Sequence, residues 1–367
     1  MSLKFEPRRE IPKSLVYGTP LLAIALTILS GYLLFMFLGL NPGSTLYIFL
    51  VSPLETRFGL AELAVKAGPL ILIATGLAIG FRANVWNIGA EGQLTIGAIF
   101  GAGVALAFWG DEGFWILPLM FVAGAAGGML WAAIPAFLKT KFEVSEILTS
   151  LMLTYVATLV LSILVHGPWR DPEGFNFPQS RLFTEAAILP IVLEGTRLHA
   201  GAFVALFAAV AAWVLLTHTV TGFQVKVVGQ APMAARFAGF SQKGTVWFSL
   251  LLAGALAGLA GMIEVAGPIG QLTPQLTPGY GFTAIIVAFL GRLNPLGIIL
   301  AGLVMAISYI GGENAQVYAQ LPQAATGVFQ GMLLFYLLAS DFLVRYRIRF
   351  RSAKHQAAKP RREVAAT

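Results

Sequence analysis

Cysteine is absent from this chain of 367 residues, and charged residues make up only 11% of it. The absence of cysteine excludes disulfides, cysteine-ligated zinc and iron–sulfur clusters. The four histidines lack the spacing of metal ligands; they are His166, His199, His218 and His355. The sequence also contains no GxxxxGK[ST] phosphate loop, GxSxG elbow or HExxH zinc helix. We therefore expect no enzymatic activity in this chain and no bound cofactor or metal.

Hydrophobic residues make up 57% of the sequence, and the mean hydropathy is +0.79. Average proteins carry about 25% charged residues, so this composition indicates an all-α polytopic membrane protein. A membrane-spanning helix needs about 20 apolar residues. The run at 282–291 is too short to span, and the run at 92–109 begins among polar residues, so both are expected to be broken or partial helices. The ten candidate spans are residues 17–40, 63–81, 92–109, 114–138, 147–166, 198–217, 245–266, 282–291, 296–312 and 322–341.

The runs divide the chain into an N-terminal segment (1–16), a transmembrane domain (17–341) and a basic tail (342–367). The first run follows a basic segment and is longer than the apolar part of a signal peptide, so we interpret it as a retained signal anchor. The positive-inside rule predicts that both termini are cytoplasmic and that the segment 167–197 is external. The net charge of +7 comes largely from basic flanks that anionic headgroups of the lipid bilayer attract. Nucleic-acid binding is not expected.

The segment GFRANVWNIGAEGQLTIG (80–97) places polar side chains inside an apolar region: Arg82, Asn84, Asn87, Glu91 and Gln93. Polar groups in a bilayer are costly unless they find partners, and membrane proteins often keep them for a polar path or a site. Two interpretations stay open. These side chains line a wet cavity, or they satisfy one another and hold two helices together. Glu91 alternatively pairs with Arg82 at the cytoplasmic interface.

A second interrupted segment, GPIGQLTPQLTPGYGF (267–282), follows the run 245–266. Its three prolines prevent a continuous helix, and Tyr280, with Phe282 and Trp86, is suited to stack on a flat ring or a sugar face. The two interrupted segments follow helices of opposite direction. This pattern predicts an inverted repeat with the substrate site between the interruptions. The alternative is an external loop rich in turn residues.

The polar loop at 221–244 is expected on the cytoplasmic side. Within it, Ala231 to Phe240 form a short helix that begins at Pro232, a favoured first-turn residue. Much of its surface is small, because it carries Ala234, Ala235, Ala238 and Gly239. A small-faced helix fits a groove on a partner protein; the alternative is a connecting loop that lies on the lipid headgroups.

Three motifs, in this order, resemble the permease subunits of ABC importers: FRANVWNIGAEGQ (81–93), VVGQAPMAARFAGF (227–240) and GYGFTAIIVAFLGRLNPLGI (279–298). The resemblance covers about residues 17–341. It is to the simple sugar and nucleoside branch, which is related to the branched-chain amino acid and ribose permeases. Ribose-type permeases carry Gly-Ile-Asp-Leu-Ser where this chain has Asn87-Ile88-Gly89-Ala90-Glu91, and this difference favours the nucleoside-like branch.

The resemblance implies three protein partners: separate ATP-binding subunits on the cytoplasmic face, an external substrate-binding protein, and a second, different permease that completes a heterodimer. It also implies a location in the plasma (inner) membrane. ATP hydrolysis then belongs to another subunit, which accounts for the missing phosphate loop. The residues implied to contact the ATP-binding subunit are Ala231, Ala234, Ala235, Arg236, Ala238 and Gly239.

We therefore predict a permease that works by alternating access and imports nucleosides, with simple sugars as the alternative. The predicted substrate path is lined by Asn84, Trp86, Asn87, Glu91, Gln93, Tyr280 and Asn294. A different class, an ion-coupled secondary transporter, is suggested by Glu91 and Glu264 in or near the membrane. A membrane enzyme or scaffold is the third alternative.

Overall fold

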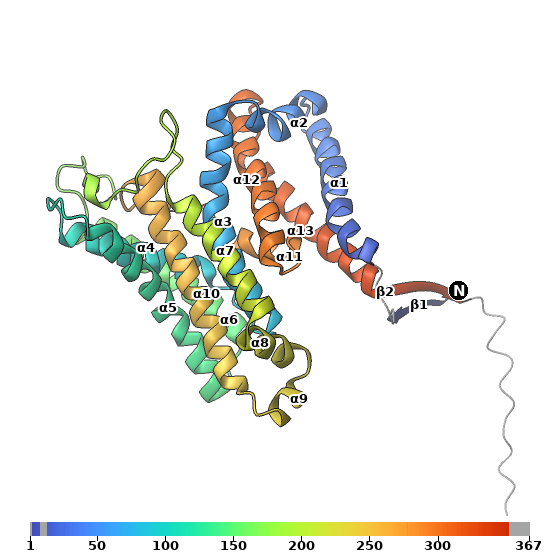
Figure 1. Cartoon of the computed structure of the whole chain (residues 1–367). Helices are drawn as coiled ribbons and strands as arrows, with labels where there is room; N and C mark the ends of the chain where they lie inside the picture. The colour runs from blue at the N-terminus through green and yellow to red at the C-terminus, as the bar shows by residue number, and fades with distance from the viewer. Residues whose placement is uncertain (1, 8–12, 277, 352–367) are drawn as a thin grey trace, which may run out of the picture. The chain divides into compact units, whose positions relative to one another are not determined.

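The computed structural model describes residues 2–7, 13–276 and 278–351. It divides into two compact units, one of residues 43–326 and one of residues 1–42 together with 327–367. Helices make up most of the described chain, as the composition predicts (Figure 1).

Nine helices among the described residues are long and apolar enough to cross a membrane. They are α1 (Lys13–Phe37), α3 (Arg57–Arg82), α4 (Ala90–Ala107), α5 (Ile116–Phe142), α6 (Glu146–His166), α7 (Gly201–His218), α10 (Gln242–Glu264), α12 (Pro295–Tyr318) and α13 (Gln323–Arg345). Two apolar helices are shorter, α2 (Pro42–Leu50) and α11 (Tyr280–Leu290), and α8 (Val220–Gln230) and α9 (Pro232–Phe237) connect α7 to α10. These helices confirm a polytopic all-α membrane protein.

Each predicted apolar run contains a helix. The run at 282–291 is α11, which has 11 residues, and the run at 92–109 is α4, which begins directly after an irregular stretch at 83–89. The sequence did not predict α2, because nine residues beginning at a proline carry too little periodic pattern to stand out. The inverted repeat stays a prediction.

Helices α4, α5 and α10 pack closely through glycines. A Cβ atom on Gly128 would lie 2.7 Å from the Cα of Gly258, and one on Gly124 would lie 2.6 Å from the Cβ of Met262. Gly97 of α4 meets the same Gly258 backbone too closely to carry any side chain. Close approach of this kind provides van der Waals contact where lipid supplies no hydrophobic driving force. The glycine spacing in the sequence therefore reflects this three-helix contact.

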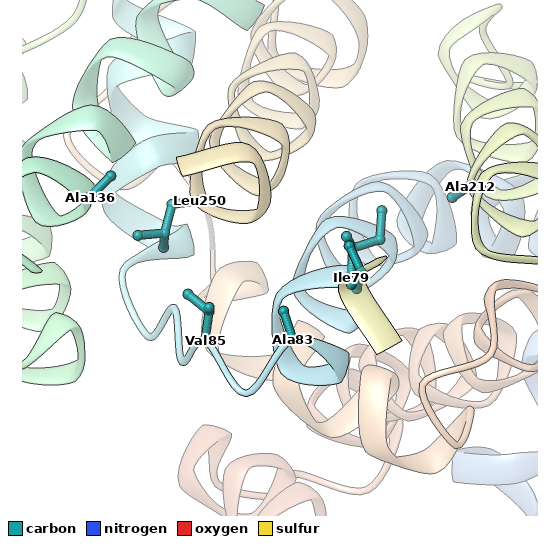
Figure 2. Close-up of a cluster of buried hydrophobic side chains, with 7 residues drawn as sticks. Ile79, Ala83, Val85, Ala136, Ala212 and Leu250 are labelled. Atoms are coloured by element: carbon teal, nitrogen blue, oxygen red, sulfur yellow. The ribbon is translucent and has the colours of Figure 1, made fainter. Parts of the chain in front are cut away.

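A hydrophobic cluster closes the end of the larger unit that carries α8 and α9 (Figure 2). It joins α3, the 83–89 stretch, α5, α7, α8 and α10, and its buried members are Ile79, Ala83, Val85, Ala136, Ala212, Val225 and Leu250. We call this the α9 end, and we call the opposite end, which carries residues 167–200, the 167–200 end. The cluster packs α8 against the C-terminal end of α3.

The smaller unit contains α1 and most of α13. The ring of Phe329 lies against Gly31, and Ser30 Oγ and Tyr336 Oη share a hydrogen bond of 2.6 Å. Strands β1 (Ser2–Pro7) and β2 (Tyr346–Arg351) pair antiparallel in this unit. The sequence analysis did not predict this sheet, although YRIRFR alternates apolar and basic residues as strands do. Within the predicted terminal segments, residues 1, 8–12 and 352–367 lie outside the described chain.

Candidate functional site

The first break in the helices is the stretch 83–89, and two amide side chains hold it to α4. Asn87 Nδ2 donates to Gln93 Oε1 at 2.8 Å, and Gln93 Nε2 donates to Asn87 Oδ1 at 3.2 Å. Asn87 Oδ1 also accepts the backbone N–H of Gly89 at 3.0 Å. Both amide side chains are 1% exposed. In this conformation, therefore, Asn87 and Gln93 satisfy one another and fix the start of α4.

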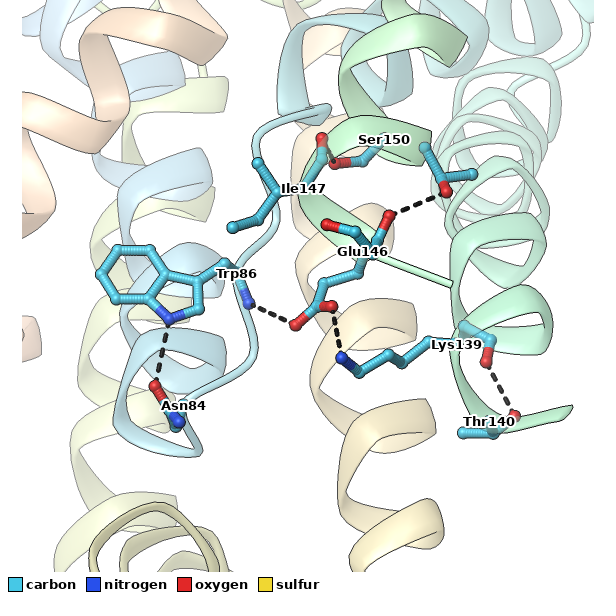
Figure 3. Close-up of polar contacts among 10 residues, drawn as sticks. Asn84, Trp86, Lys139, Thr140, Glu146, Ile147 and Ser150 are labelled. Atoms are coloured by element: carbon cyan, nitrogen blue, oxygen red, sulfur yellow. Dashed lines mark hydrogen bonds and ion pairs between the residues drawn. The ribbon is translucent and has the colours of Figure 1, made fainter. Parts of the chain in front are cut away.

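The same break is tied to α5 and α6 by polar contacts (Figure 3). Asn84, whose φ is +58°, accepts a hydrogen bond from the indole N–H of Trp86 at 3.1 Å. The backbone N–H of Trp86 donates to Glu146 Oε1 at 3.5 Å, and Glu146 Oε2 pairs with Lys139 Nζ at 2.8 Å. Glu146 is buried, so this ion pair compensates the cost of removing its charge from water.

The first break also contacts α11, through the ring of Trp86. Its centroid lies 5.0 Å from that of Phe81 on α3 and 6.1 Å from that of Phe289 on α11. Phe81 and Phe289 also stack on each other at 5.3 Å. The three rings therefore connect the end of α3, the first break and α11.

Helices α4 and α11 meet at their N-termini. Glu91, in the first turn of α4, accepts the backbone N–H of Gly281, in the first turn of α11, at 2.5 Å through Oε2. The backbones touch here, because a Cβ atom on Gly281 would overlap the main chain of Glu91. The N-terminus of a helix carries partial positive charge. One carboxylate thus lies at the positive ends of two helices that are 190 residues apart in the sequence.

The second break begins where α10 passes into a π-helical turn, η3 (Val265–Ile269), and it ends at α11. Gly270 and Gly279 have φ of +72° and +92°, a region that favours glycine. The break is fixed to the 167–197 segment: Ser180 donates its N–H to Leu272 O, and its Oγ accepts the N–H of Leu272, both at 2.9 Å. The prolines and glycines of the sequence therefore mark a real interruption.

Tyr280, the first residue of α11, is 0% exposed. Its ring packs edge-on against Tyr309 of α12 at 5.4 Å, and Lys66 Nζ of α3 lies 5.9 Å from its centroid. Tyr309 Oη shares a 2.7 Å hydrogen bond with Thr283 Oγ1. Tyr280 Oη, in contrast, has no hydrogen-bond partner.

Two ion pairs involve residues of α3 nearer the 167–200 end, Glu62 and Lys66. Arg197 donates to both carboxylate oxygens of Glu62, at 2.9 Å from Nε and 2.5 Å from Nη2. The hydrogen bonds to Glu62 raise the pKa of Arg197, which therefore stays protonated. Lys66 Nζ pairs with Glu313 Oε1 at 3.1 Å. The pairs join α3 to the 167–197 segment and to α12.

His199 lies beside these ion pairs and is 2% exposed. Its Nδ1 accepts the backbone N–H of Gly201 at 3.2 Å. Burial lowers the pKa of His199 below 6.5, while the charge of Glu62 acts in the opposite direction. The ring is thus neutral at pH 7, and its proton lies on Nε2, which has no partner.

The predicted α9 helix begins at Pro232, as the sequence indicates. Ala235 is 0% exposed, so it packs within this chain. Large apolar side chains dominate the exposed surface: Met233 is 71% exposed and Phe237 is 87% exposed. The sequence analysis overlooked them because it considered the small residues only. The other predicted contact residues, Ala231, Ala234, Arg236, Ala238 and Gly239, are exposed.

The structure brings six of the seven predicted path residues to the two breaks and the junction between them. The seventh, Asn294, caps α12 by accepting the N–H of Leu296 at 3.2 Å. Sequence reasoning missed four residues that carry the ion pairs and the buried imidazole: Glu62, Glu146, Arg197 and His199. A signal existed for Glu62 and Glu146, since each is a single carboxylate at the edge of an apolar run.

The fold defines a polytopic membrane protein, and comparisons with known proteins identify its family as one of transport permeases. The chain matches the family model described as "Branched-chain amino acid transport system / permease component" over residues 59–338. The chain therefore belongs to this family of ABC importer permeases.

Three relatives span most of the chain. It is 40% identical to the glucose ABC transporter permease protein TsgB13 of Haloferax volcanii, over 95% of this chain and 94% of that protein. It is 29% identical to the guanosine ABC transporter permease protein NupP of Bacillus subtilis, over 89% and 94%. It is 30% identical to the putative glucose ABC transporter permease protein TsgC13 of H. volcanii, over 68% and 76%.

Proposed function

We propose that this chain is a permease subunit of an ATP-driven importer for a neutral solute that contains a sugar, either a nucleoside or a simple sugar. The observation that carries the proposal is the meeting of α4 and α11 at Glu91 and Gly281. Interrupted helices whose N-termini converge are the usual construction of a solute path in a transporter. The sequence alone favoured nucleosides. The relative named for glucose, at 40% identity, supports simple sugars equally.

The proposed path runs past Glu91 and Tyr280, where the two breaks meet. The Asn87–Gln93 pair then holds the first break in shape beside the path, since its polar groups are already satisfied. With the N- and C-termini cytoplasmic, the 167–200 end faces outward and receives solute from a binding protein. A cavity of about 470 Å³ at that end, lined in part by Trp109, Arg170 and Arg181, is available for that contact.

The α9 end is then cytoplasmic and docks a separate ATP-binding subunit through Met233 and Phe237. A physical connection leads from there to the path. Phe240, just after α9, packs edge-on against Phe223 of α8 at 6.1 Å. Gly229 of α8 lies directly against the carbonyl of Arg82, where α3 ends and the first break begins. Movement of α9 is transmitted to the first break through α8.

A second, different permease completes the proposed channel. One organism carries two relatives of this chain, TsgB13 and TsgC13, whose names both refer to glucose. The presence in one organism of two related permeases with different sequences supports a heterodimer.

Vesicles that contain this chain, its partner permease and the ATP-binding subunit, supplied with the binding protein, test the proposal. We expect ATP-dependent, saturable uptake of labelled glucose or labelled guanosine, and no uptake when an ion gradient replaces ATP. Uptake that an ion gradient drives without ATP would instead support the secondary transporter.

The substitution Phe237→Ser tests the docking surface. It should lower ATP-dependent uptake at least tenfold while the protein still inserts, because an exposed apolar anchor for the ATP-binding subunit is lost. Phe142→Ser is the matched control, since Phe142 is 60% exposed at the end of α5 and lies outside α9. Equal uptake by both variants would show that α9 does not contact the ATP-binding subunit.

A further inference from the structure

Glu264, the last residue of α10, is a buried carboxylate that the proposed mechanism does not yet use. Its exposed fraction is 6%. The neighbouring cations each bind another acid, Arg197 binding Glu62 and Lys66 binding Glu313. Within the described chain, no hydrogen bond or ion pair joins Glu264 to a neighbour. A buried carboxylate without a bonded neighbour lacks the hydrogen-bond donors that its oxygens require.

Other polar groups at the second break are also without partners. Tyr280 Oη, His199 Nε2 and Gln271 Oε1 are buried and make no hydrogen bond. The Tyr280 hydroxyl and the His199 N–H are donors, and Gln271 Oε1 is an acceptor. Buried polar groups in folded proteins are nearly always satisfied by protein, water or a ligand, so a cluster of exceptions marks a candidate binding site.

Glu264, His199 and Tyr280 lie near one another. A Cβ atom on Gly267, three residues after Glu264, would lie 2.7 Å from His199 Nε2, and Lys66 Nζ lies 5.9 Å from the centroid of the Tyr280 ring. The carboxylates of Glu264 and Glu91 both lie within electrostatic range of the Tyr280 hydroxyl. Glu264 itself lies within range of the Lys66 and Arg197 cations. Since α3, α4, α10 and α11 all contribute, the cluster sits between the second break and the junction of α4 with α11.

We propose that Glu264 and Tyr280 form a hydroxyl-binding site for the sugar moiety of the solute. The Glu264 carboxylate accepts hydrogen bonds from solute hydroxyls, and Tyr280 Oη donates a hydrogen bond to a solute oxygen. Adjacent hydroxyls, which simple sugars and ribose share, supply the donors that an unpaired carboxylate needs. This inference rests on the proposed function and adds the residues that recognise the solute.

The surrounding charges favour a neutral ligand. A metal cation on Glu264 would be repelled by Lys66 and Arg197, which lie within electrostatic range. A phosphorylated solute would meet the carboxylates of Glu62, Glu264 and Glu313. A neutral molecule with several hydroxyls avoids both repulsions.

The test is the uptake KM of the reconstituted complex for labelled glucose and labelled guanosine, with Glu264→Gln and Tyr280→Phe. We expect the KM of the transported solute to rise about 10- to 100-fold with Glu264→Gln and about 3- to 10-fold with Tyr280→Phe, since a charged acceptor is worth more than a neutral donor. Glu112→Gln and Tyr318→Phe are the matched controls, because Glu112 is exposed in the connection between α4 and α5 and Tyr318 is 72% exposed. The controls should change the KM less than twofold.

A second measurement is the inhibition of uptake by monodeoxy analogues of the transported solute. If Glu264 had only a structural role, its substitution would not change the relative inhibition by these analogues. The wild-type complex should discriminate against at least one analogue about tenfold, and Glu264→Gln should abolish that discrimination. Tyr280→Phe decides the outcome even if Glu264→Gln fails to assemble. If the wild-type complex transports normally and Tyr280→Phe changes neither the KM nor the discrimination between analogues, this inference is overturned. Transport of neither solute class by the wild-type complex would overturn the proposed function and this inference together.

Discussion

The two breaks in the membrane helices differ in how their polar groups are satisfied. In the first break, Asn87 and Gln93 bond each other, and Glu146 pairs with Lys139. In the second, the Tyr280 hydroxyl and the His199 Nε2 are buried without partners. Satisfied polar groups stabilise a shape, whereas unsatisfied ones cost stability unless a ligand supplies the bonds. We therefore propose that the first break is a structural element that carries movement from α9, and that the second break is where solute is recognised.

The contact that joins the two breaks should be the most sensitive to change. Gly281→Ala places a methyl group against the main chain of Glu91, which has no rotamer by which to move away. We expect a loss of about 3 kcal/mol or more in stability, or failure of the protein to fold. Thermal unfolding in detergent measures it. Gly327→Ala is the control, because a Cβ atom there meets nothing within 4 Å; equal losses in both variants would show that the junction is not tightly packed.

The first break should respond strongly to loss of its amide pair. Asn87→Ala or Gln93→Ala leaves a buried amide without its partner, so each should cost about 2 kcal/mol. The double variant should cost clearly less than the sum of the two, because the second substitution removes the orphaned group. Gln323→Ala, at an exposed amide side chain in the first turn of α13, is the control. Additive effects would contradict a structural pair.

The helices and both interruptions could be predicted from the sequence, because the length of an apolar run and a cluster of glycines and prolines are local signals. The sequence also placed polar residues of the first break correctly near a helix start. It left open whether these polar groups line a cavity or satisfy one another, since the Asn87–Gln93 pair depends on the bend between them. It did not reveal the Glu91–Gly281 bond, which spans 190 residues. The burial of Ala235 could not be foreseen either, because burial against neighbouring helices cannot be inferred from a small side chain alone.

A smaller, pH-dependent effect should mark the second break. The pKa of His199 is lowered on folding, so the unfolded chain binds more protons than the folded one between that pKa and about 6.5. The stability from neutral His199 is present above about pH 6.5 and is lost as the pH falls below it. Thermal unfolding from pH 7 to pH 5 should show this loss, and His199→Gln should reduce it. An unchanged pH profile in the variant would show that His199 is not held neutral.

The most direct test measures the stability and the uptake KM of Tyr280→Phe and Asn87→Ala in parallel. The phenylalanine ring keeps the contacts with Tyr309 and Lys66, and it removes only an unpartnered hydroxyl. Tyr280→Phe should therefore unfold at the same or a higher temperature than wild type but raise the KM, while Asn87→Ala should unfold earlier with its KM unchanged. If Tyr280→Phe destabilised the protein with a normal KM, or if Asn87→Ala raised the KM at full stability, the division of roles between the two breaks would be wrong.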